Sequence, residues 1–312
     1  MDSLPFATAA KAPPTADETL RMRKFLLTGA VLLVGFGLPL FKLVTFALHS
    51  ELYSFIVIVP FISAYLVWSD SGRFYPGGLP VTPLWTIGLT VLGAGLLLWA
   101  VLLYFLSAHH AQIDLLALCM YSFVSLLAAA ACHHLGRHTL RIFAFPLGFL
   151  VFLAPFPVAV ETGVETILQH GSSWVAHTLF DVASMPVFRN GTFFQLPGFS
   201  MQVAPECSGI RSTLALFLTS LVAGQMFLRS PWKRALLALL VLPVALLRNG
   251  FRVFVIGELC VKIGPHMIDS WIHRHGGPAF FALSLVPFSL LLYFFYKTDL
   301  RAAAAAKSTP SS

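Results

Sequence analysis

The sequence predicts an all-α protein that crosses a membrane about eight times. Of its 312 residues, 57% are hydrophobic and only 11% are charged, and the mean hydropathy is +0.82. Soluble domains carry about 25% charged and about 45–50% apolar residues, so this composition excludes a soluble globular protein. Eight apolar segments also approach the roughly 20 residues that a spanning helix needs. Their ranges are 25–48, 52–68, 85–106, 113–132, 142–160, 211–228, 235–256 and 278–296.

Three of these segments carry additional information. The first is longer than the apolar region of a signal peptide, which has about 7–15 residues, so we expect it to be retained. The second is short, and the fifth contains three prolines that kink or end a helix, Pro146, Pro155 and Pro157. We expect 25–297 to form a single membrane domain, with flexible cytosolic tails over 1–24 and 298–312.

The positions of the lysines and arginines predict the orientation, because positively charged loops stay in the cytoplasm. With both termini inside, only Arg189, Lys262 and Arg274 fall in outer connections. We therefore expect a multi-pass membrane protein with both termini in the cytosol, whose excess charge of +7 marks topology and implies no nucleic-acid partner. The cations expected on the cytosolic side are Lys11, Arg21, Arg23, Lys24, Arg73, Arg137, Arg141, Arg229, Lys233, Arg234, Lys297, Arg301 and Lys307.

One outer connection, over 161–206, is long and patterned. Apolar residues recur at helical spacing, which predicts an amphipathic helix at the outer interface; they are Val164, Leu168, Val175, Leu179 and Val182. Asn190-Gly191 between apolar residues indicates a two-residue hairpin, and the residues from Phe199 to Val203 alternate as a strand does. The sequence therefore predicts a small β element just before Cys207.

The segment APECSGIRS at 204–212 is the first candidate site, because it places Cys207 at the start of the sixth span. A helix N-terminus lowers the pKa of a thiol, and Arg211 is expected one turn further on the same face. Glu206 and Ser208 flank the cysteine. The alternative is that Cys207 is a small packing residue, or forms a disulfide with Cys260.

Two further segments are expected at the same outer level. Arg248 and Arg252 share one face of the seventh span beside Asn249, at a depth where positive charge is otherwise scarce; the alternative is contact with lipid headgroups. The connection before the eighth span carries three histidines that could exchange protons near neutral pH. These are His266, His273 and His275, accompanied by Asp269 and Arg274. A solvated polar loop is the alternative, and no second ligand cluster accompanies the histidines to indicate a metal site.

In this order, the stretches FPLGFLVFLAPFPVAV, MPVFRNGTFFQLPGFSMQVAPECSGIRSTLALF, RNGFRVF and IHRHGG resemble the exosortase and archaeosortase family of membrane cysteine transpeptidases. The resemblance implies a catalytic set of Cys207, Arg252 and His273, with His275 as a competing histidine. The family's early segment usually reads Tyr-Ser-His-Gly, whereas Phe55 follows Ser54 here.

The resemblance also implies a reaction. Cys207 would form a thioester with an exported protein at a C-terminal signal made of a Pro-Glu-Pro-like motif, a membrane helix and a basic cluster. Arg252, helped by Arg211 or Arg248, would stabilise the oxyanion, and His273 would transfer protons. No cofactor or metal is expected. The rival readings are a secondary transporter or channel, disfavoured because no inverted repeat is apparent, and a catalytically inactive assembly subunit.

Overall fold

The computed structural model describes residues 16–70, 83–106, 112–270 and 276–308. Contacts between residues divide the chain into two compact units, Met1–Val158 and Ala159–Ser312. The boundary follows a non-helical stretch that contains Pro155 and Pro157, as the helix-breaking effect of proline predicts. Compact packing units are not necessarily separate domains, so the single domain over 25–297 stays a prediction.

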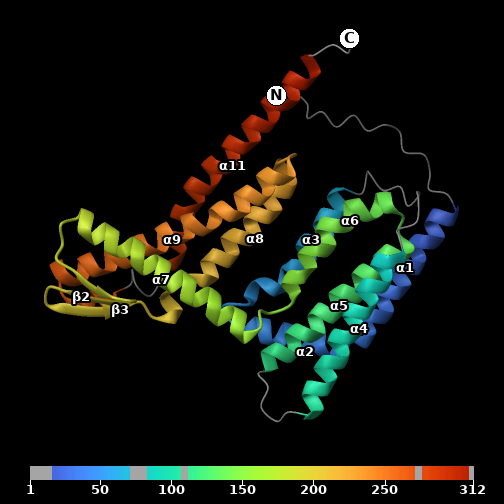
Figure 1. The fold of residues 1–312 in the computed structure, drawn as a ribbon, viewed down its shortest axis with the longest axis horizontal. Helices are drawn as coiled ribbons and strands as arrows, with labels where there is room; N and C mark the ends of the chain where they lie inside the picture. Colours follow the sequence, from blue (N-terminus) through green and yellow to red (C-terminus); the bar gives the residue numbers. More distant parts are fainter. Residues whose placement is uncertain (1–15, 71–82, 107–111, 271–275, 309–312) are drawn as a thin grey trace. The chain divides into compact units, whose positions relative to one another are not determined.

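The first unit is made of helices (Figure 1). Its elements are α1 (Ala16–Gly35), α2 (Gly37–His49), η1 (Ser54–Val57), α3 (Val59–Ser69), α4 (Pro83–Leu106), α5 (Gln112–His134), α6 (Arg137–Phe149) and η3 (Leu150–Leu153).

Helices α4 and α5 pack against each other because a glycine lets their backbones approach. A Cβ atom at Gly93 would lie 2.7 Å from the Cγ atom of Leu126. The buried hydroxyl of Ser122 donates a hydrogen bond to the Gly93 carbonyl at 2.7 Å. Small residues at helix contacts are typical of membrane proteins, where lipid removes the hydrophobic force between helices.

The first predicted span is bent, and both predicted tails are partly helical. The axes of α1 and α2 differ by 69° at Phe36, which separates the two helices. Helix α1 begins at Ala16, where Asp17 pairs with Arg21 at 3.0 Å. At the other end, α11 (Gly277–Ser308) includes the sequence RAAAAAK. Alanine is the best helix former, so a segment of low complexity continues the helix.

The second unit combines helices with a small sheet. Its elements are α7 (Val158–Val182), β1 (Phe188–Asn190), β2 (Phe193–Leu196), β3 (Phe199–Gln202), η4 (Pro205–Cys207), α8 (Ile210–Phe227), α9 (Pro231–Lys262), η5 (Pro265–Asp269) and α11. Helix α7 confirms the helix predicted within the 161–206 connection, although Val182 on its predicted apolar face is 79% exposed.

The predicted hairpin is present, with its turn shifted by one residue. Asn190 pairs with Phe193 as the last residue of β1, so Gly191 and Thr192 form the two-residue turn. Gly191 has φ +63°, which is the left-handed conformation that glycine adopts without strain. The third strand, β3, pairs antiparallel with β2. Residues of this sheet, α7 and α9 form one buried cluster: Ala176, Phe180, Phe194, Leu196, Met201, Val203 and Val253.

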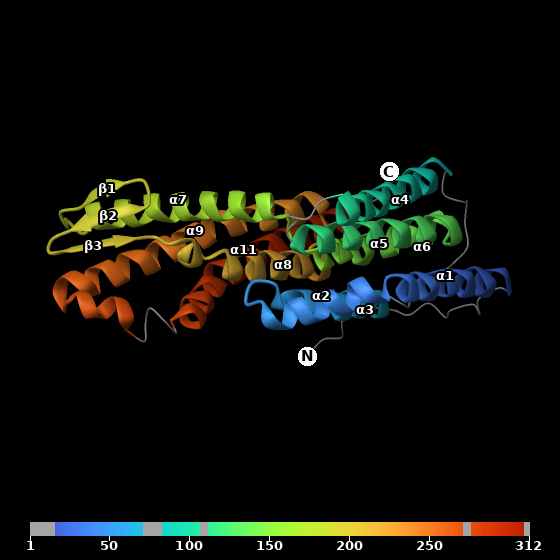
Figure 2. The same ribbon diagram turned by 90° about the horizontal axis from the view of Figure 1, so that it is seen from below.

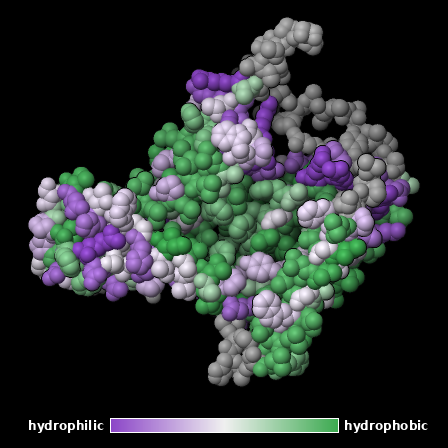
Figure 3. All heavy atoms as spheres, viewed as in Figure 1, coloured by the Kyte–Doolittle hydropathy of each residue, from purple (hydrophilic) through white to green (hydrophobic). Residues whose placement is uncertain are grey.

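The helices are apolar enough to cross a bilayer. Within the described ranges, five helices have the length and composition of a membrane span, or up to seven spans if each bent helix pair counts as one. The fold is thus a polytopic all-α membrane protein with a small sheet. Figure 3 shows apolar residues over most of the visible helical surface, whereas polar residues are more frequent over the sheet. Exposed aromatic and aliphatic side chains on the helices are expected where lipid replaces water.

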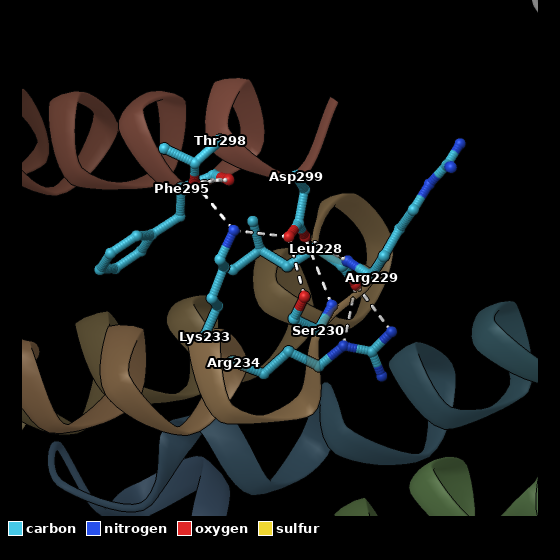
Figure 4. A network of polar contacts seen from close by, with 8 residues as sticks. All are labelled: Leu228, Arg229, Ser230, Lys233, Arg234, Phe295, Thr298 and Asp299. Atoms are coloured by element: carbon cyan, nitrogen blue, oxygen red, sulfur yellow. Dashed lines mark hydrogen bonds and ion pairs between the residues drawn. The ribbon is translucent and has the colours of Figure 1, made fainter. Parts of the chain in front are cut away.

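A buried ion pair joins the end of α11 to the turn between α8 and α9 (Figure 4). Asp299 accepts hydrogen bonds from Lys233 Nζ at 2.7 Å, from the Arg229 N–H at 2.8 Å and from the Ser230 hydroxyl at 2.9 Å. Lys233 Nζ also donates to Thr298 Oγ1 at 2.9 Å. Asp299 therefore pairs with a buried cation and also accepts hydrogen bonds from polar groups of the turn.

We predict that Asp299→Ala lowers the free energy of unfolding by about 3–5 kcal/mol, because it leaves a buried lysine without its carboxylate. Thermal unfolding in detergent measures the change. Lys262→Ala is the matched control: its pair with Glu258 leaves Lys262 72% exposed, so its loss should cost less than about 1 kcal/mol. Equal destabilisation by the two variants would contradict this assignment.

Candidate active site

Cys207 lies in a tight turn that precedes α8. It ends η4, and its N–H donates to the Ala204 carbonyl at 2.9 Å. Gly209 follows with φ +79°, and a Cβ atom there would lie 2.9 Å from Arg248 Nη2, so this position requires glycine. The left-handed residue separates Cys207 from α8. The expectation that Cys207 and Arg211 share one helical face is therefore wrong, and Arg211 is exposed on α8.

Asn249 of α9 holds two consecutive backbone carbonyls of this turn. Its Nδ2 atom donates to the carbonyl of Cys207 at 2.9 Å and to the carbonyl of Ser208 at 3.1 Å. The hydroxyl of Ser172 in α7 is a third acceptor at 3.0 Å. Asn249 is 2% exposed, so its amide finds its hydrogen-bond acceptors within the protein, as buried polar groups do.

Helix α7 holds the chain just before this turn. The Gln169 side-chain amide donates to the carbonyl of Val203, and the Ser173 hydroxyl donates to the Gln169 carbonyl at 2.8 Å. The close approach of α7 and α9 depends on Gly250, where a Cβ atom would lie 2.5 Å from Val175 Cβ. The sequence analysis missed Gln169 and Ser172; the apolar spacing of Leu168 and Val175 on the same helix is the sequence signal that could have indicated their face.

A pocket of about 40 Å³ lies beside Cys207. The cysteine and Arg252 both line it, although they come from different elements. Asn249, Val253 and Ile256 complete the wall from α9, Ile268 contributes from η5, and the sheet side is formed by Met201, Gln202 and Val203. A thiol and a guanidinium at one small apolar cavity are the residue types that a covalent acyl transfer uses.

The two arginines of α9 occupy different places. Both belong to one continuous helix, one turn apart, as predicted. Arg252 lines the pocket, whereas Arg248 is 7% exposed and donates through Nη2 to the Gly209 carbonyl at 3.4 Å. Its Nη1 atom has no hydrogen-bond partner among the described residues. Arg248 therefore adds positive charge behind the Cys207 turn without entering the pocket.

The histidine segment is only partly covered by the structure. His273 and His275, with Arg274, lie outside the described residues, as do the side chains of Asp269 and Glu206. His266 is exposed in η5, the element whose Ile268 reaches the pocket. The described start of this connection is thus adjacent to Cys207.

Cys207 and Cys260 are not joined by a disulfide, and neither are Cys119 and Cys132, which complete the set of cysteines. Cys260 is 2% exposed on α9 and does not line the pocket. The alternative in which Cys207 forms a disulfide with Cys260 is therefore not seen in this structure.

We predict that Asn249→Ala lowers the free energy of unfolding by about 2 kcal/mol or more, because two buried carbonyls lose their donor. Thermal unfolding in detergent measures the change, and Ser172→Ala is the matched control. The two hydrogens of Nδ2 have three acceptors, so after loss of the Ser172 hydroxyl both still have a carbonyl partner. A larger loss of stability in Ser172→Ala than in Asn249→Ala would contradict this description of the turn.

Comparison with known proteins identifies the family. No curated protein and no solved structure matches the chain. A family model described as transmembrane exosortase matches residues 45–290. The match includes the Cys207 turn, the whole of α9 and the histidine segment, and it extends through most of both units. The chain therefore belongs to the transmembrane exosortase family.

Proposed function

We propose that this protein is a membrane cysteine endopeptidase or transpeptidase that cleaves the C-terminal anchor of exported proteins. The observation that carries the proposal is that Cys207 and Arg252 line one pocket, because a nucleophile and an oxyanion donor must meet at one reacting carbonyl. Membership of the exosortase family supports the same class of reaction.

In the proposed reaction, the Cys207 thiolate attacks the carbonyl carbon of the scissile peptide bond. The guanidinium of Arg252 donates to the oxyanion, and Arg248 and Arg211 add positive potential from further away. The carbon–nitrogen bond then breaks, and His273 or His275 gives its proton to the leaving amine. This leaves a thioester, which the acceptor attacks after losing a proton to the histidine, and the Cys207 thiolate is released.

The supporting residues hold this geometry. Asn249 positions the carbonyls of Cys207 and Ser208, and the buried hydroxyl of Ser208 lies 3.4 Å from the N–H of Ile210 at the start of α8. Glu206, next to the nucleophile, is proposed to contact substrate. A cysteine whose own carbonyl and the next carbonyl are both held loses little backbone freedom when it attacks, which favours a productive approach.

The proposed location is the outer face of a bacterial inner membrane, with both termini in the cytosol. Thirteen of the 20 lysines and arginines would then lie on the cytosolic side, as the positive-inside rule favours. The proposed substrates carry a Pro-Glu-Pro-like motif, one membrane helix and a basic cluster at their C-terminus. Such an anchor would bring its cleavage site to the level of the pocket.

We predict that Cys207→Ala abolishes cleavage of a co-expressed protein that carries this C-terminal signal, because the thioester cannot form. The readout is the size and the membrane attachment of the product. Cys260→Ala is the matched control and should cleave normally, because that thiol lies outside the pocket. Cleavage by a Cys207→Ala protein that accumulates at the wild-type level would contradict the mechanism.

We also predict that a membrane-impermeant maleimide added to intact spheroplasts modifies Cys207. The test uses a variant in which Cys119, Cys132 and Cys260 are replaced by alanine, so that no other thiol reacts. In a second variant Cys207 is also replaced by alanine, and Arg229→Cys supplies the one remaining thiol. Position 229 is exposed in the α8–α9 turn. That thiol should react only after permeabilisation, and the opposite pattern would reverse the orientation.

A further inference from the structure

The strand next to the active-site turn has an unpaired edge. The sheet order is β1-β2-β3, so β3 pairs with β2 on one side and with no strand of the described residues on the other. In Figure 2, β3 lies on the side of the sheet toward α9, and the two elements are in contact. An edge strand presents backbone donors and acceptors that can pair with another extended chain.

The register shows which residues of β3 offer those groups. The Val203 N–H donates to the Thr192 carbonyl at 3.0 Å, and Phe194 pairs with Met201 two residues along the same ladder. Bonded and non-bonded pairs alternate in an antiparallel ladder. The backbone groups of Ser200 and Gln202 therefore point away from β2, toward the unpaired edge.

This edge leads directly to the nucleophile. Gln202 is part of the pocket wall together with Cys207, and the segment between them begins at Val203, whose carbonyl Gln169 holds. The inner face of β3 is anchored by Met201, which is 8% exposed in the cluster with α7 and α9. The edge therefore ends beside the pocket of the thiol, while the side chains of Ser200 and Gln202 are exposed.

We propose that the unpaired edge of β3 binds the substrate segment next to the scissile bond as an added β-strand. Backbone hydrogen bonds to Ser200 and Gln202 hold that segment, and one small apolar side chain enters the pocket beside Cys207. The inference rests on the proposed function and adds the mode of substrate binding to it. Strand addition derives affinity from the main chain and specificity from side-chain pockets.

The size of the pocket sets the expected specificity. Its volume is about 40 Å³, whereas a cavity that holds benzene has about 150 Å³. Its walls are mostly apolar, with Val203, Val253, Ile256 and Ile268 among them. The occupant is therefore a side chain of the size of alanine or valine on an extended peptide.

The test measures the rate at which peptide vinyl sulfones modify Cys207 in the full-length protein in detergent. One probe is biotinylated Ala-Ala-Ala vinyl sulfone, and a second carries N-methyl groups on its internal amides. We expect the methylated probe to react about tenfold more slowly in the wild-type protein, since one or two hydrogen bonds are lost. Iodoacetamide, which has no peptide backbone to pair, measures the intrinsic reactivity of the thiol.

A matched pair of variants assigns the effect to the edge. Ser200→Pro removes the outward N–H of β3 and no bond of the β2–β3 ladder, because proline is tolerated on edge strands. It should reduce the difference between the two probes to less than about threefold. Ser200→Ala changes the side chain alone and should keep the wild-type difference.

The outcomes separate the two proposals. Equal rates for the two probes in the wild-type protein would overturn strand addition, as would an undiminished difference in Ser200→Pro. Equal labelling by probes with alanine and with tryptophan next to the sulfone would overturn the pocket assignment. A Cys207 that reacts with neither peptide probe nor iodoacetamide would instead overturn the proposed function. A dimer that Ser200→Pro dissociates, with unchanged probe rates, would assign the edge to a second copy of this chain.

Discussion

The amide of Asn249 is the interaction on which the candidate site depends. Two hydrogens on one nitrogen hold the carbonyls of Cys207 and Ser208, in a place where water cannot satisfy them. Backbone polar groups buried in a membrane protein must find partners within the protein. Gly209 has a left-handed backbone conformation and separates Cys207 and Ser208 from α8. Their carbonyls therefore depend on this amide rather than on the hydrogen bonds of that helix. The position of the thiol is thus set by a side chain from a distant segment.

That amide lies near its acceptors where α7 and α9 approach closely. Gly250 lets α9 lie against Val175 of α7, and Gly257 does the same against the ring of Phe180. Helix α7 in turn positions Gln169 against the carbonyl of Val203. Small residues on α9 therefore support the Cys207 turn indirectly, because they bring α7 near enough to share in holding it. At the far end of α9, the Lys233–Asp299 pair connects the same helix to α11.

Charge and strand geometry complement each other around the pocket. Arg252 lines it, and Arg248 contacts the Gly209 carbonyl of the Cys207 turn, so this part of the structure carries two cations. The charges alone do not align an extended peptide with the thiol. In the proposed function, the edge of β3 would do so. The same few residues between β3 and α8 would then carry both recognition and reaction.

The sequence alone determined the class of the fold and the residue types of the site. Apolar runs identified the helices because membrane spans require a minimum length, and the positions of Cys207, Arg248 and Arg252 in the chain already indicated chemistry. It mispredicted the hairpin turn by one residue at Gly191 and the continuity from Cys207 to Arg211, because both depend on left-handed glycines whose φ angles no hydropathy pattern records. Only the tertiary structure placed Gln169 and Ser172 against the Cys207 turn and gave β3 its unpaired edge. The contacts of Gln169 and Ser172 join segments far apart in the chain, and the close helix packing that buried glycines permit brings those segments together.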